Sequence, residues 1–114
     1  MVLQAGTTRS GDTELLVSIV KTLKISFPLV CPFQAIVPSF DLPWGFVLAS
    51  KKHDPQELSA QEVDNRLEAR GIGTTGYYDG LTHQGLFILP RYLRNDLDTI
   101  GKVIEDENPL FLNA

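Results

Sequence analysis

The chain has 114 residues, 43% of them hydrophobic and 21% charged, which indicates a single folded domain over residues 1–114 and excludes an intrinsically disordered protein. The formal net charge of −4 argues against nucleic-acid binding, which needs a basic surface, and the single cysteine excludes an intrachain disulfide or a cysteine-rich metal site. No apolar stretch is long enough for a membrane span and the first residues lack the pattern of a secretory signal, so we expect a cytoplasmic protein without membrane contact.

The beginning of the chain predicts a strand and then a helix. Residues 1–5 form a short apolar run that ends at Gly6, which favours a strand followed by a loop. Asp12 is placed to cap a helix, because its carboxylate could accept hydrogen bonds from the amides of the first turn. Pro28 ends that helix. Its apolar stripe consists of Leu16, Ile19, Val20, Leu23 and Phe27.

Two strands are predicted next, at residues 33–37 and 44–49. The second is apolar without alternation, which is typical of a strand that is covered on both faces. Only five residues, 39–43, link the two strands. Because a parallel return needs a crossover of about a dozen residues or more, we expect an antiparallel pair.

The second half of the chain predicts a helix, a strand and a helix. Ser59 and Glu62 form a capping box, and Gly71 suits the C-terminal cap of the same helix. The apolar run 86–89 suggests a short strand. Pro90 then opens the last helix. The apolar residues that would share one face of that helix are Leu93, Leu97, Ile100 and Ile104.

This order of elements predicts an α/β fold. We expect the first helix to cover one face of the sheet, and the second strand of the hairpin to lie beside the first strand. The outer edge of the first strand would then lack a partner, and unpaired edges invite pairing with another chain. We therefore expect the isolated chain to associate with itself or to be poorly soluble.

Several motifs have a structural explanation. Residues 71–76 match the spacing of a dinucleotide-binding glycine loop, but they follow a helix and precede a turn-rich stretch, so we interpret them as an ordinary loop. His53 and His83 lack the partners that a metal site needs, and His83 is better explained as a hydrogen-bonded structural residue. Cys31 lies in an apolar run and is interpreted as a packed thiol. We therefore assign no metal ligand and no catalytic residue.

The link between the two strands of the hairpin contains a more suggestive group of residues. Phe40, Asp41 and Trp44 lie close together there. Connections at strand ends often carry functional sites, and aromatic walls beside an acid suit an alkylammonium ligand. The two aromatic residues could equally close the core at the end of the sheet, which is the preferred explanation on physical grounds alone.

The same residues belong to a series of motifs that resembles the polyamine aminopropyltransferases. The motifs lie at residues 2–6, 36–40, 44–50, 77–83 and 89–93. Their order and spacing are similar to those of the C-terminal half of spermidine synthases along nearly the whole chain. The motif at 37–40 followed by Trp44-Gly45, and the motif at 107–111, look most like the thermospermine synthase branch.

The resemblance implies the C-terminal part of an S-adenosylmethionine-dependent methyltransferase-like (Rossmann-like) sheet that ends in an antiparallel strand pair. It implies a transferase of polyamine biosynthesis, which moves an aminopropyl group from decarboxylated S-adenosylmethionine to putrescine or spermidine without a tightly bound cofactor. Position by position, Gln4 matches a glutamine that contacts the amine substrate. Phe40 falls where spermidine synthases commonly have a tyrosine that faces the same amine, and Trp44 matches an apolar wall of that pocket.

Two departures from the family pattern change what we expect. Phe40 lacks the tyrosine hydroxyl, and a lost hydrogen bond costs roughly 0.5–1.5 kcal/mol, which should shift amine preference without abolishing binding. The family's glycine-rich nucleotide loop, acidic ribose-binding residue and catalytic aspartate loop all precede the point where this chain starts. We therefore expect a fragment of a longer protein or a truncated gene product, inactive by itself and without cofactor-binding residues.

Three hypotheses follow for the function. In the first, the chain supplies part of the amine pocket of a spermidine/thermospermine synthase-like enzyme through Gln4, Phe40 and Trp44. In the second, it is a truncated, non-catalytic paralogue that acts as an interaction module and associates with itself or with an intact synthase. In the third, it is a fragment of a methyltransferase that has the same sheet.

Overall fold

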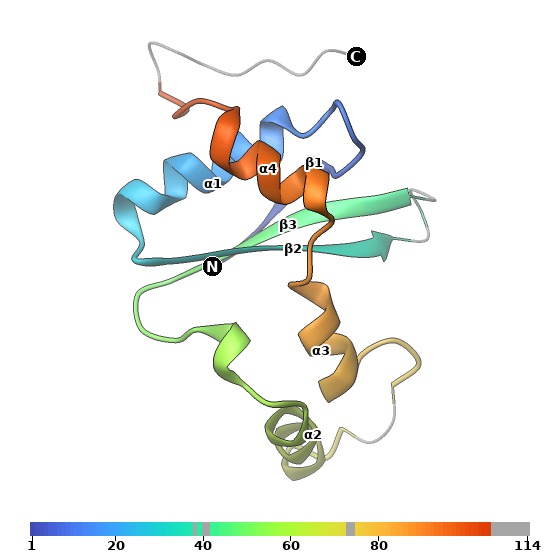
Figure 1. The fold of residues 1–114 in the computed structure, drawn as a ribbon. Helices are drawn as coiled ribbons and strands as arrows, with labels where there is room; N and C mark the ends of the chain where they lie inside the picture. Colours follow the sequence, from blue (N-terminus) through green and yellow to red (C-terminus); the bar gives the residue numbers. More distant parts are fainter. Residues whose placement is uncertain (38, 40–41, 73–74, 106–114) are drawn as a thin grey trace.

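A three-stranded antiparallel sheet lies at the centre of the computed structural model, which describes residues 1–37, 39, 42–72 and 75–105 (Figure 1). The strands β1 (Val2–Thr7), β2 (Leu29–Val37) and β3 (Leu42–Ser50) lie in the order β1-β3-β2. Both neighbouring pairs are antiparallel. The antiparallel hairpin and the position of its second strand beside β1 are therefore confirmed.

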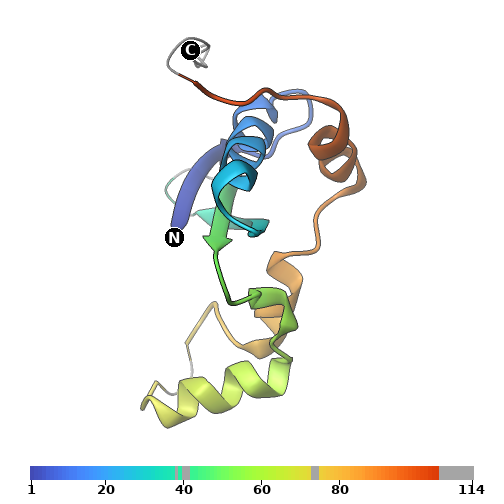
Figure 2. The same ribbon diagram turned by 90° about the vertical axis from the view of Figure 1, so that its left-hand side faces the viewer.

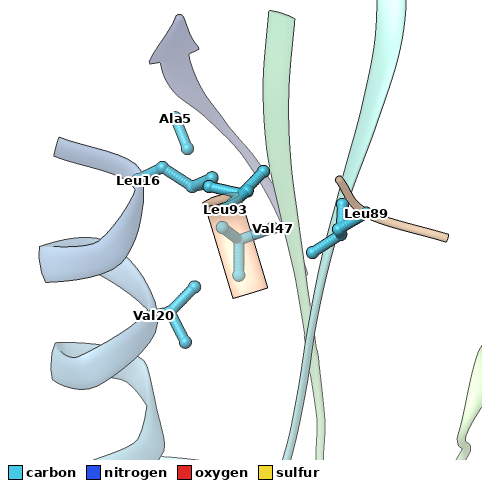
Figure 3. Close-up of a cluster of buried hydrophobic side chains, with 6 residues drawn as sticks. All are labelled: Ala5, Leu16, Val20, Val47, Leu89 and Leu93. Carbon is cyan, nitrogen blue, oxygen red and sulfur yellow. The ribbon is translucent and has the colours of Figure 1, made fainter. Parts of the chain in front are cut away.

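Helices α1 (Glu14–Ser26) and α4 (Arg91–Thr99) cover one face of this sheet (Figure 1). The apolar stripe of α1 follows from its sequence spacing, and its buried part packs against the sheet. Two hydrogen bonds join α4 to the start of α1 and the end of β1. The Tyr92 hydroxyl donates to the Thr8 carbonyl, and the Thr13 hydroxyl donates to the Asp96 carboxylate at 2.6 Å. The core between these elements consists of Ala5, Leu16, Val20, Val47, Leu89 and Leu93 (Figure 3).

The short helix η1 (Pro55–Glu57) and the helices α2 (Ala60–Ala69) and α3 (Gly80–Leu86) lie on the opposite side of the sheet from α1 and α4 (Figures 1 and 2). α3 contacts β2, whereas α2 packs on α3 and extends away from the sheet. The molecule is therefore elongated, with extents of 46 × 33 × 24 Å.

The ends of α2 follow the sequence prediction. The Ser59 hydroxyl accepts the Glu62 backbone N–H at 3.1 Å, and the Glu62 carboxylate accepts the Ser59 N–H at 3.4 Å, which completes the capping box. Gly71 has a φ of +72°, and the N–H groups of Gly71 and Ile72 donate to the carbonyls of Glu68 and Leu67. This pair of hydrogen bonds ends the helix in an arrangement that favours glycine at position 71.

Two predictions about α1 and β2 need correction. α1 begins after Thr13, and Asp12 caps nothing, because its carboxylate accepts hydrogen bonds from the Arg9 guanidinium, at 2.8 Å from Nε. β2 begins at Leu29 rather than at residue 33. Pro32 is accommodated within the strand because β2 lies at an edge of the sheet, where a residue can do without its N–H.

The prediction of a strand at residues 86–89 is wrong. Helix α3 ends at Leu86 and residues 87–89 form the turn and irregular segment after it; Asp79 caps the start of this helix by accepting the Thr82 N–H at 2.8 Å. A run of four apolar residues does not distinguish a strand from a helix end, and contacts with α2 and β2 decide the outcome.

The last helix is also shorter than predicted. α4 ends at Thr99, where Gly101 turns the chain with a φ of +84°. Ile100 and Ile104 therefore do not continue the helical face that Leu93 begins.

Candidate functional site

The register of β1 and β3 determines where two of the predicted site residues lie. Gln4 pairs with Phe46, and after a bulge in β1 Thr7 pairs with Trp44. Paired residues point to the same face of a sheet, and so do residues two positions apart on one strand. Gln4, Trp44 and Phe46 therefore share one face, and Gln4 lies diagonally across from Trp44.

That face is the one turned away from α1. Gly45 and Val47, which alternate with Trp44 and Phe46, are buried on the α1 side, and a Cβ on Gly45 would lie 3.2 Å from Leu16 of α1. On the opposite face, Gln4 is exposed and Trp44 is half-buried. Phe40 and Asp41 lie outside the described residues, so the structure brings together two of the three predicted site residues and leaves the third undescribed.

A layer of aromatic side chains continues this face from β3 across β2. The rings of Phe46 and Phe33 are stacked with centroids 5.3 Å apart, and Phe87, at the end of α3, lies 5.5 Å from Phe33. Sequence reasoning did not single out these three residues. The alternation of side chains between the two faces of each strand was the signal available in the sequence. Only the pairing register of β2 and β3 shows that Phe33 and Phe46 meet.

His83 links α3 to η1 and has the structural role predicted for it. Its ring is buried, with Nε2 at 2.7 Å from the Pro55 carbonyl and Nδ1 at 2.8 Å from the Tyr78 hydroxyl. Because a carbonyl only accepts, Nε2 donates its proton there, and in the neutral ring Nδ1 accepts from Tyr78. Burial raises the pKa of Tyr78 above its ordinary value, which keeps the hydroxyl protonated for this bond.

Cys31 is the packed thiol that the sequence indicates. Its side chain is buried, and Sγ lies 3.8 Å from the Asp54 carboxylate. Burial, followed by the negative charge of Asp54, raises the pKa of this thiol above its ordinary value. Because the thiolate is the reactive form, the structure gives Cys31 no activation as a nucleophile.

Among the described residues, three clefts lie at other places. One of about 500 Å³ lies between the ends of β1 and β3 and the η1–α2 region, with Val2, Asp54 and Arg66 among its lining residues. One of about 450 Å³ lies between α2 and residues 75–79, and Asp64 and Glu68 contribute to its acidic lining. The third, about 360 Å³, lies between β2 and α3. All three are lined by residues other than Gln4 and Trp44.

Within the described ranges, no three histidine, cysteine or acidic side chains are grouped so that they could hold a metal ion. In the same part of the chain, no helix has both the length and the apolar character needed to cross a membrane.

Curated proteins similar to this chain are named polyamine aminopropyltransferases. The relative from Sulfurisphaera tokodaii is 35% identical over 113 residues, which is 99% of this chain and 38% of the relative. The relative from Sulfolobus acidocaldarius is 36% identical over 110 residues, or 96% of this chain and 36% of the relative. "Polyamine aminopropyltransferase 2" from Hyperthermus butylicus is 41% identical over 91 residues, which is 80% of this chain and 30% of the relative. No protein-family model matches.

A solved structure shares the fold. The spermidine synthase from Thermotoga maritima superposes with a TM-score of 0.63 at 22% identity, covering 87% of this chain and 34% of that one. The sequence matches confirm the resemblance inferred from the motifs, and the superposition confirms the methyltransferase-like fold class. The chain spans less than two-fifths of the length of each of these proteins, which fits the prediction that it corresponds to their C-terminal part.

Proposed function

Because this chain resembles part of the polyamine aminopropyltransferases in sequence and in fold, we propose that it forms the amine-binding side of an aminopropyltransferase active site. The reaction would transfer an aminopropyl group from decarboxylated S-adenosylmethionine to putrescine or spermidine. Residues 1–114 would be the C-terminal half of one catalytic domain, in the cytoplasm.

The observation that carries this proposal is the position of Gln4 and Trp44 on one face of two neighbouring strands. The Gln4 carboxamide makes no hydrogen bond to another described side chain, so its oxygen is available to accept from an ammonium group of the amine. The Trp44 ring offers an aromatic surface, which attracts alkylammonium groups. The two side chains come from adjacent strands and are held at a fixed spacing by the sheet.

The chemical contribution of this chain would be positioning. Aminopropyl transfer needs a deprotonated amine in line with the carbon next to the sulfonium, and holding it there removes much of the entropic barrier. Decarboxylated S-adenosylmethionine supplies the transferred group, and no residue of this chain is assigned to bind it. We therefore propose that the chain is inactive by itself. With Phe40 in place of a tyrosine, the acceptor and product could be longer or branched polyamines, as in the thermospermine branch.

The proposal is tested by calorimetric titration of the chain with spermidine and with putrescine. Gln4→Ala removes one hydrogen bond to a charged group, which is worth about 1.5–3 kcal/mol, so the dissociation constant should rise about tenfold to a hundredfold. Gln61→Ala is the matched control, because Gln61 is an exposed glutamine on α2, whose carboxamide donates to Asn65. An affinity that is the same in Gln4→Ala as in the unaltered chain would contradict the proposal.

A second candidate function is the non-catalytic interaction module. The observation in its favour is that β1 pairs only with β3 among the described strands, which leaves a strand edge available to another polypeptide. In this case the chain should co-purify with an intact aminopropyltransferase whether or not Gln4 is changed to alanine, and spermidine should not bind to the isolated chain.

A further inference from the structure

Strand β1 contains a bulge that decides which of its side chains lies beside Trp44. Between Gln4 and Thr7 there are two residues, whereas between their partners on β3 there is only Gly45. Gly6, one of the two, has a φ of +80°, which is typical of a glycine at a bulge. Without the bulge, Gly6 would lie opposite Trp44 and Thr7 would point toward α1. The bulge therefore places the Thr7 side chain on the face that Gln4 and Trp44 share.

On the opposite face, toward α1, Thr8 fills the space that Gly45 leaves free. Thr8 is buried, and a Cβ on Gly45 would lie 3.2 Å from its methyl group. From there the Thr8 hydroxyl reaches across β3 and donates to the side-chain oxygen of Gln34 on β2, at 3.0 Å. Gln34 pairs with Gly45, so its side chain lies on the same face. This hydrogen bond therefore joins β1 to β2, two strands that do not pair with each other.

The bond between Thr8 and Gln34 is compatible only with the bulged register. In a continuous pairing without the bulge, Thr8 would point to the face away from α1, where it could not reach Gln34. The Tyr92 hydroxyl of α4 donates to the Thr8 carbonyl, so Thr8 is held on both sides of the bulge's end. Because the Thr8 hydroxyl is buried, loss of the Gln34 oxygen would remove its acceptor and weaken the bulged register relative to the continuous one.

On the basis of the proposed amine-binding function, we propose that Gln34 is a positioning residue of the amine-binding face. Acting through Thr8 from the opposite side of the sheet, it holds β1 in the register that places Thr7 opposite Trp44. The register itself is a property of the chain without ligand, so it can be measured separately from amine binding.

The chemical consequence is a hydroxyl beside the indole ring of Trp44. The Thr7 hydroxyl oxygen accepts the Arg9 N–H at 3.0 Å, and its second lone pair can accept from an ammonium group. Together with the Gln4 carboxamide, the amine-binding face then offers two acceptors and one aromatic surface, which suits an alkylammonium ligand. With Gly6 opposite Trp44, one of the two acceptors would be missing.

The register is tested by nuclear Overhauser contacts in the chain without polyamine. The unaltered chain should give contacts between the backbone protons of Thr7 and Trp44, which are paired across the strands. Gln34→Met keeps the length of the side chain but removes the acceptor, and it should weaken these contacts. Contacts between Val2 and Leu48, which pair before the bulge, should be unchanged.

The effect on the site is tested by calorimetric titration with spermidine. Gln34→Met should raise the dissociation constant by about fivefold to tenfold, the worth of one hydrogen bond. In the Thr7→Val background the same substitution should change it by less than about twofold, because the hydroxyl that Gln34 positions is already absent. Thr8→Val should act as Gln34→Met does, whereas Thr8→Ser, which keeps the hydroxyl, should retain both the backbone contacts and the affinity.

Gln61→Met is the matched control, because Gln61 is an exposed glutamine on α2, and it should change neither measurement. Circular dichroism verifies that each variant is folded, and if Gln34→Met is not, the pair Thr8→Val and Thr8→Ser makes the same comparison. A variant that is less stable to urea but keeps the backbone contacts and the affinity would overturn the proposal, as would an equal effect of Gln34→Met in the Thr7→Val background. If the unaltered chain does not bind spermidine, the proposed function fails, and the backbone contacts alone decide whether Gln34 holds the register.

Discussion

Gly80, the first residue of α3, leaves no room for a side chain against the start of α2. A Cβ at this position would lie 1.9 Å from the Ala60 carbonyl oxygen, and 2.6 and 2.7 Å from two further backbone atoms of Ala60. Real Cβ contacts are essentially never shorter than 3.0 Å. The substitution Gly80→Ala must therefore move α2 and α3 apart by about 1 Å or more, because the obstacle is backbone and has no alternative rotamer.

The cost of this displacement has two parts. Overpacking of a well-packed contact costs about 1–3 kcal/mol. The Gly80 N–H also donates to the Asp64 carboxylate at 2.7 Å, and a hydrogen bond to a charged group contributes about 1.5–3 kcal/mol. The better helix propensity of alanine offsets up to about 1 kcal/mol of this loss of stability. We expect Gly80→Ala to lower the free energy of unfolding by about 2–5 kcal/mol, a large share of the total for a small domain.

Urea unfolding followed by circular dichroism and by the fluorescence of Trp44, the single tryptophan, measures this change. Gly85→Ala is the matched control, since it makes the same substitution in the same helix and nothing lies within 4 Å of its Cβ position. It should be neutral or stabilising by up to about 1 kcal/mol. Equal effects of the two substitutions would refute the close α2–α3 contact.

Three further predictions concern other parts of the fold. Leu93→Ala removes a fully buried core side chain and should lower the free energy of unfolding by about 2–5 kcal/mol in the same urea assay. Leu81→Ala is the control, because Leu81 is 74% exposed, and it should change the free energy of unfolding by less than about 0.5 kcal/mol. Ser59→Ala removes the capping hydroxyl of α2 and should cost about 1 kcal/mol, most of which Ser59→Asn should restore, as a comparison of urea midpoints would show. Hydrogen bonds from Thr82 hold the pKa of the Asp79 carboxyl below its ordinary value. The ionised carboxylate therefore stabilises the folded state above about pH 4, and this contribution is lost as the pH falls through the folded-state pKa. The difference in unfolding free energy between the unaltered chain and Asp79→Asn, measured across an acid series, should shrink as the pH falls, and a difference that grew would contradict the capping role.

Residues close together in the sequence were enough to predict much of the fold. Pro28 ends α1, the Ser59–Glu62 capping box begins α2, and Gly71 ends it, because each depends on the backbone within one helical turn. The five-residue link at 39–43 was enough to establish that β2 and β3 are antiparallel, since a chain that short cannot return parallel. The order of the motifs was also enough to indicate the enzyme family that the sequence matches support.

Contacts between distant segments decided the rest. The apolar run 86–89 forms the end of α3 and the turn after it because α2 and β2 pack against this helix. Helix α4 ends at Thr99 because the chain turns back toward α1 at Gly101, and the Lys102 N–H then donates to the Ser18 hydroxyl. The sequence supplied Gln4 and Trp44 as candidates, but their presence on one face depends on the β1–β3 register and its bulge. Strand register follows from the packing of whole faces between segments some forty residues apart, and local sequence patterns do not contain that information.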